Sequence, residues 1–572
     1  MNADIAFVNG VVYSVTMDGK RIGGTAVAVS GDKILKVGSD AEINNYIGKA
    51  TKVIDCKGNT ILPGLSDAHC HPSWTASIIA ACDLTGVKMQ VGQPCDEVID
   101  ILKQRLKKYI DENPNDEIIR GSGWDWSFFN GSYGEVRPPN RHDLDEVCKD
   151  KPIILESYCQ HNIWVNTKAI ELAGITAETP TPESGNIERE EDGYPSGLFQ
   201  EMSAIMMIRH GVPNYDYSVE EYKEILLEYQ RSLAHFYGVT MVTDCLHGDN
   251  AAEAYKQLAE EGKLKIWTRG VYHINPENIE EGLERLQNRW EKGDEYDIFA
   301  IQTIKIFIDG EMAMCEPWEK GITEALGLPE SYGGTPLWTL EQAKFVIDKA
   351  ISLGYRLHIH AMGDLAVKIA VEALEYAQNK NPGDHRNAIA HVMAVKPEDI
   401  IKMGKQKIIC AMQPCWMVNE RTVDGFYVPF YGLERSMNFY PNKQLTDAGC
   451  IVTYGTDFPV TNPPNPFHEI HCALTRMVHK DSRDYPEYDG KVLGPPGDEK
   501  RDCVTLDEAI RCLTITGAYQ NRLENIAGSL EEGKFADVVV IDRNLEKTPI
   551  DEIYDIKVHV TLFRGEIVYQ AP

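Results

Sequence analysis

Several histidine and aspartate residues of this chain stand where they could bind a divalent metal. His69 and His71 are two residues apart in the segment Asp67-Ala-His-Cys-His71. On an extended strand, residues two apart share a face, so both imidazoles can point to one ion while Cys70 points away. A single His-x-His pair is weak evidence for a metal site, because chance and core packing also produce such pairs. Other apolar stretches end in further possible ligands, namely His360, His391 and Asp457.

Lys305 stands in an unusual place, within Gln302-Thr-Ile-Lys305-Ile-Phe-Ile-Asp309-Gly310. A lysine amid isoleucine and phenylalanine is costly to bury without a special role. One such role is carbamylation by CO₂, which converts the cation into a carboxylate able to bridge two metals. The alternative is a buried ion pair, for example with Asp309.

These residue types predict hydrolytic chemistry. Zinc with an open coordination position lowers the pKa of bound water toward 7, so hydroxide is available to attack a polarised carbonyl. Asp457 is placed to take the proton of the attacking water and pass it to a departing nitrogen. If only one metal binds, His360 or His391 could help to hold the developing oxyanion.

The elements that must position these residues form a βα pattern. Short apolar strands alternate with amphipathic helical stretches, which predicts an α/β fold with a parallel sheet, and eight strands predict a (β/α)₈ TIM-type barrel. In such barrels the carboxyl ends of the strands converge on one site. The expected strands are Ile61–Asp67, Thr240–Cys245, Lys265–Val271, Ile301–Ile308, Arg356–His360, Ala388–His391, Ile408–Met412 and Cys450–Tyr454.

Both ends of the chain are rich in short strands, from Ile5–Val15 onward and again from Ala536 to Tyr569. We expect residues 1–62 and 525–572 to build one composite β-sandwich domain, although two unrelated terminal hairpins are an alternative. Residues 63–524 would form the barrel. About 150 residues separate its first two strands, so a large insertion is expected at about 84–235.

The chain resembles the amidohydrolase superfamily, in particular its YtcJ-like "amidohydrolase 3" branch, which includes N-substituted formamide deformylases. The resemblance covers essentially the whole length. Five motifs carry it: Leu62-Pro-Gly-Leu-Ser-Asp-Ala-His-Cys-His71, Lys305-Ile-Phe-Ile-Asp-Gly310, His360-Ala-Met-Gly-Asp364, Tyr454-Gly-Thr-Asp-Phe-Pro-Val460 and Gly533-Lys-Phe-Ala-Asp-Val-Val-Val540.

The resemblance implies a two-metal site. His69, His71 and Asp457 would bind the first ion and His360 and His391 the second, with carboxylated Lys305 as the bridge. The metal would be Zn²⁺, one or two ions per chain, although Mn, Fe or Co suit the same ligands.

Further residues resemble stretches that line or cover the pocket in this branch. Trp124, His161 and Glu201 lie in the insertion, and Arg476 follows the eighth strand. All four are candidate substrate-binding residues. Each also has a structural alternative: packing for Trp124, a fold role for His161, and ion pairing for Glu201 and Arg476.

The reaction expected is hydrolysis of a non-peptide C–N bond in a small formamide, N-acyl or cyclic amide substrate. Alternatives are a deaminase or a lactone or ester hydrolase on the same site, and, less favoured, a non-catalytic barrel scaffold. Such scaffolds lose the metal ligands, whereas all six candidate positions are filled here.

The composition of the chain disfavours some classes of binding partner and cellular location. A formal net charge of −30 disfavours binding to nucleic acid or to anionic membranes. The 14 cysteines lack any Cys-x-x-Cys pair and suit free thiols in a reducing cytosol. The N-terminus has no cationic start followed by an apolar run, so it does not resemble a signal peptide. We therefore expect a soluble cytoplasmic enzyme, and a homodimer is a reasonable expectation.

Overall fold

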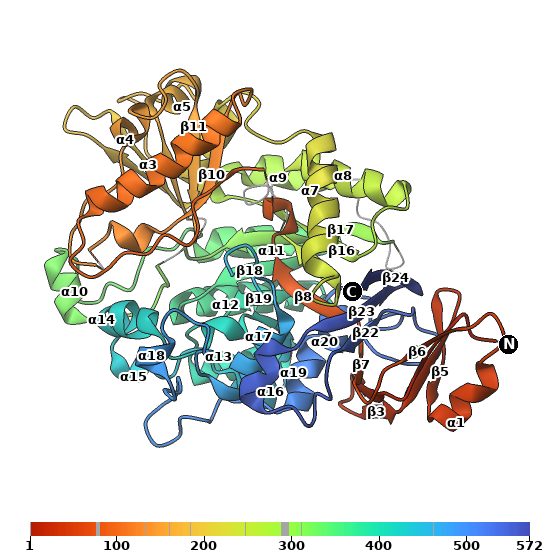
Figure 1. The fold of residues 1–572 in the computed structure, drawn as a ribbon. Coiled ribbons are helices and arrows are strands. Elements are labelled where there is room, and N and C mark those ends of the chain that lie inside the picture. The colour runs from red at the N-terminus through yellow and green to blue at the C-terminus, as the bar shows by residue number, and fades with distance from the viewer. Residues whose placement is uncertain are drawn as a thin grey trace.

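A computed structural model describes residues 2–75, 80–131, 133–159, 161–182, 185–245, 248–287, 297–310, 312–461 and 463–572. At its centre is an eight-stranded parallel sheet rolled into a barrel, which confirms the predicted α/β barrel (Figure 1). Its strands, in their order around the barrel, are β8 (Leu65–Cys70), β15 (Val239–Asp244), β16 (Trp267–His273), β17 (Phe299–Phe307), β18 (Arg356–Ala361), β19 (Ala388–His391), β20 (Ile409–Met412) and β21 (Ile451–Tyr454).

The first and last barrel strands are joined by the loop that follows β21. The Asp457 N–H donates to the His69 carbonyl at 2.8 Å, and the His71 N–H donates to the Phe458 carbonyl at 2.7 Å. The Asp67 carboxylate accepts from the backbone N–H of Thr456 at 3.0 Å. This junction brings the loop that carries Asp457 against the strand that carries both histidines.

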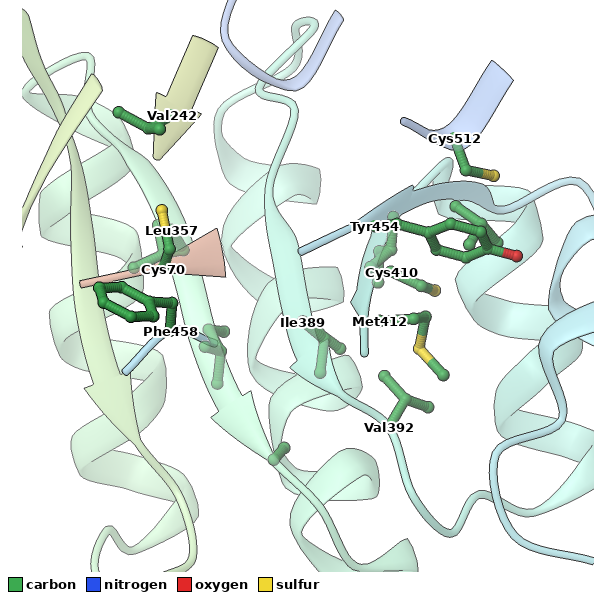
Figure 2. Packing of buried hydrophobic residues seen from close by; sticks show 14 of the residues in the cluster. Cys70, Val242, Leu357, Ile389, Val392, Cys410, Met412, Tyr454, Phe458 and Cys512 are labelled. Atoms are coloured by element: carbon green, nitrogen blue, oxygen red, sulfur yellow. The ribbon is translucent and has the colours of Figure 1, made fainter. Parts of the chain in front are cut away.

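Helices cover the outside of the barrel because one face of each is apolar. In α11 (Leu340–Ser352) the buried residues recur at helical spacing: Ala343, Val346, Ile347, Ala350 and Ile351. Other covering helices are α8 (Asp249–Glu260), α12 (Asp364–Lys380), α13 (Pro397–Gln406) and α17 (Pro466–Thr475). Figure 2 shows part of the resulting core, in which Cys70 lies among apolar side chains such as Leu357 and Phe458.

The strand expected at Ile61–Asp67 is in fact two strands. It breaks at Gly64 into β7 (Thr60–Pro63), which belongs to a different sheet, and β8 of the barrel. The break needs glycine, because a Cβ at this position would lie 2.0 Å from the Thr240 hydroxyl. The Gly64 N–H donates instead to the Asp537 carbonyl at 2.8 Å. Apolar residues continue through the break, so hydrophobicity alone did not reveal it.

Strands from both ends of the chain share one sheet, which confirms the composite β-structure. Its six strands run in the order β24-β23-β22-β7-β2-β3. The bounds are β24 (Glu566–Gln570), β23 (Val558–Phe563), β22 (Val538–Ile541), β2 (Val11–Val15) and β3 (Arg21–Gly24). A four-stranded sheet of β5 (Lys33–Gly38), β4 (Ala26–Ser30), β1 (Ile5–Val8) and β6 (Lys52–Asp55) lies beside it.

The strand expected at Ile5–Val15 is also divided. Asn9 has a φ of 54°, and the chain turns at Asn9-Gly10 so that β1 and β2 enter different sheets.

The insertion forms its own six-stranded mixed sheet, at the upper left of Figure 1. Its order is β13 (Asn186–Arg189), β14 (Pro195–Gln200), β12 (Asn162–Val165), β11 (Ile153–Ser157), β10 (Ile119–Trp124) and β9 (Cys82–Asp83). Helices α3 (Cys95–Glu112), α4 (Arg141–Asp145), α5 (Thr167–Leu172) and α6 (Glu201–Gly211) accompany it. Among the described residues, no helix is both long and apolar enough to cross a lipid bilayer.

Candidate metal centre

The carboxyl ends of the barrel strands bring the predicted ligands into one buried cluster. Potential ligand atoms of His69, His391 and Asp457 all lie within 4.8 Å of one another. The Asp457 Oδ1 atom is 3.1 Å from His69 Nε2 and 3.0 Å from His71 Nε2. The ring centres of His360 and His391 are 4.5 Å apart. Each of these five side chains is at least nine-tenths buried.

Hydrogen bonds hold the Nδ1 atoms of three histidines and direct their Nε2 atoms into the cluster. His71 Nδ1 donates to the Cys245 carbonyl at 3.1 Å, and His391 Nδ1 to Gln413 Oε1 at 2.8 Å. His69 Nδ1 lies 2.6 Å from His358 Nε2. Metal-binding histidines commonly have their second nitrogen held in this way, since it sets the ring orientation and tautomer.

The spacing of these atoms fits a cation between them. His71 Nδ1 faces the Cys245 carbonyl, to which it can only donate, and its Nε2 faces a carboxylate oxygen of Asp457 at only 3.0 Å. Two lone pairs at this distance repel each other unless a proton or a metal ion lies between them. Two ligands of a tetrahedral zinc ion are about 3.4 Å apart, close to the observed spacing.

The protonation states also suit metal binding. Burial and the nearby Lys305 hold the pKa of His69 well below its ordinary value. Burial lowers the pKa of His391 to about 4, with Asp457 opposing the shift. Burial alone would raise the pKa of Asp457, but the facing His69 and His71 outweigh it and hold that pKa well below its usual range. Neutral imidazoles and an ionised carboxylate are the forms that coordinate metals.

Lys305 lies inside this cluster, with its Nζ 3.3 Å from His69 Nε2 and 4.0 Å from Cys245 Sγ. It is 3% exposed, and burial lowers the pKa of its amine. The alternative ion pair with Asp309 is not found in the described part of the chain. The Asp309 carboxylate accepts instead from the backbone N–H groups of Met314, Met362 and Gly363 at 2.9–3.0 Å.

His360 Nε2 is buried without a hydrogen-bond partner among the described residues. Its nearest carboxylate oxygen, Asp309 Oδ1, lies 3.6 Å away, which is too far for a good hydrogen bond. A buried imidazole nitrogen left in this state carries a desolvation cost, and a bound metal ion would remove that cost.

Three residues of the predicted site have strained backbone conformations. His391, Asp457 and Glu201 have φ values of 75°, 56° and 63°, in the left-handed region that residues other than glycine rarely adopt. Such conformations cost about 1–3 kcal/mol each and persist where the surrounding structure holds them, often at functional sites.

Two of the four expected substrate-binding residues reach the metal cluster. His161 Nδ1 lies 2.9 Å from Glu201 Oε2, and the His161 ring centre is 6.1 Å from that of His360. Their side chains are 20% and 25% exposed, so they lie at the border between the buried centre and solvent.

Trp124 has a different environment from the one expected. It is fully buried in the core of the insertion, where it contacts Trp126 and Trp164 edge to face. Its indole N–H donates to the Leu155 carbonyl at 3.0 Å. The structure therefore assigns Trp124 the packing role that the sequence left as an alternative.

Arg476 is also used within the fold. Its guanidinium is 1% exposed and donates to three backbone carbonyls, those of Leu493, Tyr440 and Phe439, at 2.6–2.8 Å. These bonds correct the expectation of substrate binding, because they engage the donors on all three nitrogens. They also differ from the ion pair considered as the alternative.

Three residues of the centre were not assigned a role from the sequence: Cys245, His358 and Gln413. Cys245 Sγ lies within 4.8 Å of ligand atoms of His69 and His71. Cys245 and Gln413 directly follow β15 and β20, and His358 shares a strand face with His360. The strand-end rule that identified His391 could have found them. Cys70, by contrast, faces the barrel wall as expected, and its Sγ lies 3.5 Å from the Thr243 carbonyl.

Comparisons with known proteins show the family and the fold of this chain. A sequence profile described as "Amidohydrolase family" matches residues 52–569. N-substituted formamide deformylase of Arthrobacter pascens is 25% identical over 99% of this chain and 98% of its own length. The putative amidohydrolase YtcJ of Bacillus subtilis (strain 168) is 25% identical, with 98% of each chain covered. A crystal structure of an uncharacterized metal-dependent hydrolase from Pyrococcus horikoshii OT3 has the same fold, with a TM-score of 0.70 at 23% identity, covering 96% of this chain and 99% of the other.

Proposed function

Since the chain belongs to the amidohydrolase family, we propose that it is a metal-dependent hydrolase that cleaves a non-peptide C–N bond in a small molecule. The observation that supports this most strongly is the buried convergence of His69, His391 and Asp457 within 4.8 Å. The substrate class proposed is a formamide, an N-acyl amine or a cyclic amide, as the resemblance to a formamide deformylase over nearly the full length suggests.

His69, His71 and Asp457 would hold one divalent ion, with Zn²⁺ favoured by the nitrogen-rich donor set, and His360 and His391 a second. Bound there, the metal would supply a lowered pKa for water and polarisation of the substrate carbonyl. Asp457 would accept the proton of the attacking water, because its carboxylate remains ionised within the cluster.

Lys305 is proposed to carry a CO₂-derived carbamate that bridges the two ions. Its Nζ lies among the expected ligands, 3.3 Å from His69 Nε2, and the ion pairs of the described residues do not include it. An unpaired buried ammonium costs several kcal/mol, whereas a carbamate would pair with the metal ions. Two measurements test this role: the intact mass of the wild-type protein, and the metal content of the Lys305→Met variant. An unmodified Lys305 in active protein that holds two metal ions would exclude the role.

The proposed function is tested with metal-replete protein against N-formyl, N-acetyl and cyclic amides, with esters and aminopurines as probes of the alternative activities. One or two divalent ions per chain and loss of amide hydrolysis on chelation are expected. Asp457→Asn should lower kcat by at least about 100-fold. Protein that binds no metal, together with unchanged activity in His69→Ala and His71→Ala, would refute the proposal.

A further inference from the structure

The insertion presents a histidine–glutamate pair at the rim of the metal centre. His161 directly precedes β12 and Glu201 directly follows β14, and these strands pair antiparallel with Asn162 opposite Gln200. Both residues therefore leave the insertion's sheet at the same end. Two bonds join them, one from the Glu201 backbone N–H to the His161 carbonyl at 2.8 Å and one between His161 Nδ1 and Glu201 Oε2 at 2.9 Å.

This pair packs against the barrel next to its site. The His161 and His360 rings are 6.1 Å apart and tilted by 56°. The Glu201 carboxylate lies over Gly310, which follows β17 after Lys305 and Asp309, and a Cβ at Gly310 would come within 2.5 Å of Glu201 Oε1. Glycine at position 310 thus makes room for the carboxylate that orients His161.

The local conformation is costly. Glu201 adopts a φ of 63° at the first position of α6, although a left-handed glutamate is strained. This conformation accompanies the 2.9 Å contact between the Glu201 carboxylate and His161 Nδ1. The pair is partly exposed, whereas the neighbouring expected metal ligands are buried.

We infer that His161 is a catalytic residue that transfers a proton to the nitrogen of the scissile bond, and that Glu201 is the residue that positions it. The inference rests on the proposed function. The neutral ring donates its Nδ1 hydrogen to Glu201, which makes Nε2 the proton acceptor and carrier. A carboxylate that orients a histidine in this way is a recurrent arrangement for proton transfer.

The proton balance is simple. The attacking water forms the new C–O bond and gives one proton to Asp457. His161 Nε2 takes the remaining hydroxyl proton of the tetrahedral adduct and delivers it to nitrogen as the C–N bond breaks. The products are a carboxylate and a neutral amine. Asp457 returns its proton to solvent, so His161 takes over the delivery to nitrogen that the sequence assigned to Asp457. The substrates that most need this step are amides of basic alkyl amines, because such amines leave poorly as anions.

Two probes with the same acyl group test the inference, an N-alkyl amide and a 4-nitrophenyl ester whose leaving group needs no proton. His161→Gln should lower kcat/KM for the amide by 10²–10⁴-fold and for the ester by less than about tenfold. Glu201→Gln and Gly310→Ala should lower amide hydrolysis by at least about tenfold, since the first removes the charge that stabilises protonated His161 and the second displaces the Glu201 carboxylate. The double variant His161→Gln/Glu201→Gln should be no worse than His161→Gln, because the pair acts as a unit.

His142→Ala is the matched control. His142 lies in the same insertion and has its own carboxylate partner, Glu190, at 2.9 Å, but its side chain is 57% exposed. Its substitution should leave both activities unchanged. Metal content and thermal unfolding of every variant separate a chemical effect from misfolding.

Equal losses on amide and ester, or no loss in His161→Gln, would overturn the role of His161 while leaving the proposed function intact. A wild-type protein without metal and without hydrolase activity would instead refute the proposed function, and this inference with it.

Discussion

We predict that Gln413 sets the affinity of the proposed metal ion at His391. Its side chain is fully buried, and its Oε1 accepts from His391 Nδ1 at 2.8 Å. The donor side of the same amide contacts the Ala411 carbonyl at 3.3 Å, which fixes the orientation of the amide. Gln413→Met keeps the volume but removes the acceptor, so His391 loses the bond that holds its ring and tautomer.

Loss of the residue that hydrogen-bonds to the second nitrogen of a metal-binding histidine weakens metal binding by 10–100-fold, which equals about 1.4–2.7 kcal/mol. The assay is competition between apoprotein and a chromophoric zinc chelator. In Gln413→Met, the zinc ion that binds more weakly should lose 10–100-fold in affinity. Gln413→Glu should keep near wild-type affinity, because a carboxylate also accepts a hydrogen bond from His391 Nδ1.

Gln230→Met is the control for the loss of a buried glutamine. Gln230 is 7% exposed, and within the described part of the chain its side chain bonds to the backbone of Lys263 and Lys265. This variant should lose stability but keep wild-type zinc affinity. Unchanged zinc affinity and stoichiometry in Gln413→Met would refute the argument that the Nδ1 bond prepares His391 for a metal.

Three further predictions concern stability. Arg476→Met leaves the Leu493 and Phe439 carbonyls without the donor that Arg476 supplies, while the Tyr440 carbonyl keeps the Asn442 N–H. It should lower the free energy of unfolding by about 2 kcal/mol or more in urea titrations; a raised KM with unchanged stability would instead restore its substrate role. Burial lowers the pKa of His235 to about 4, so between about pH 6.5 and 4 the unfolded chain binds more protons and stability falls as pH falls. Over that window wild type should lose about 3 kcal/mol relative to His235→Gln, and parallel pH curves would contradict this. Gly64→Ala places a Cβ 2.0 Å from the Thr240 hydroxyl and should cost about 1–3 kcal/mol in the same titrations, with unchanged stability as the contrary outcome.

The barrel and its strand ends were predictable because strands buried on both faces form contiguous apolar runs, and polar residues directly after such runs converge at one end. His391 and Asp457 were identified in this way.

Other parts of the structure depend on contacts between residues far apart in the sequence, which no local sequence pattern predicts. The bond between His161 and Glu201 requires an antiparallel register between strands far apart in the insertion. The burial of Trp124 and Arg476 depends on packing around them, and both residue types are equally common at pocket walls. The break at Gly64 follows from a close approach to Thr240, which is distant in the sequence.

The composite sheet has a consequence for how the protein is made. Strand β7 leads directly into β8, which carries His69, yet Leu62 of β7 pairs with Val539 near the other end of the chain. A ribosome adds about 5–20 residues per second, so β7 can pair with β22 only after the roughly 480 residues between Leu62 and Val539 have been synthesised. Until then the edge of β7 has no partner from β22, and the strand that leads into the histidine pair is held on one side only. The strand that precedes the proposed metal ligands thus gains its second partner late, and a variant that lacks β22 (Val538–Ile541) should fail to acquire metal even though it keeps every proposed ligand.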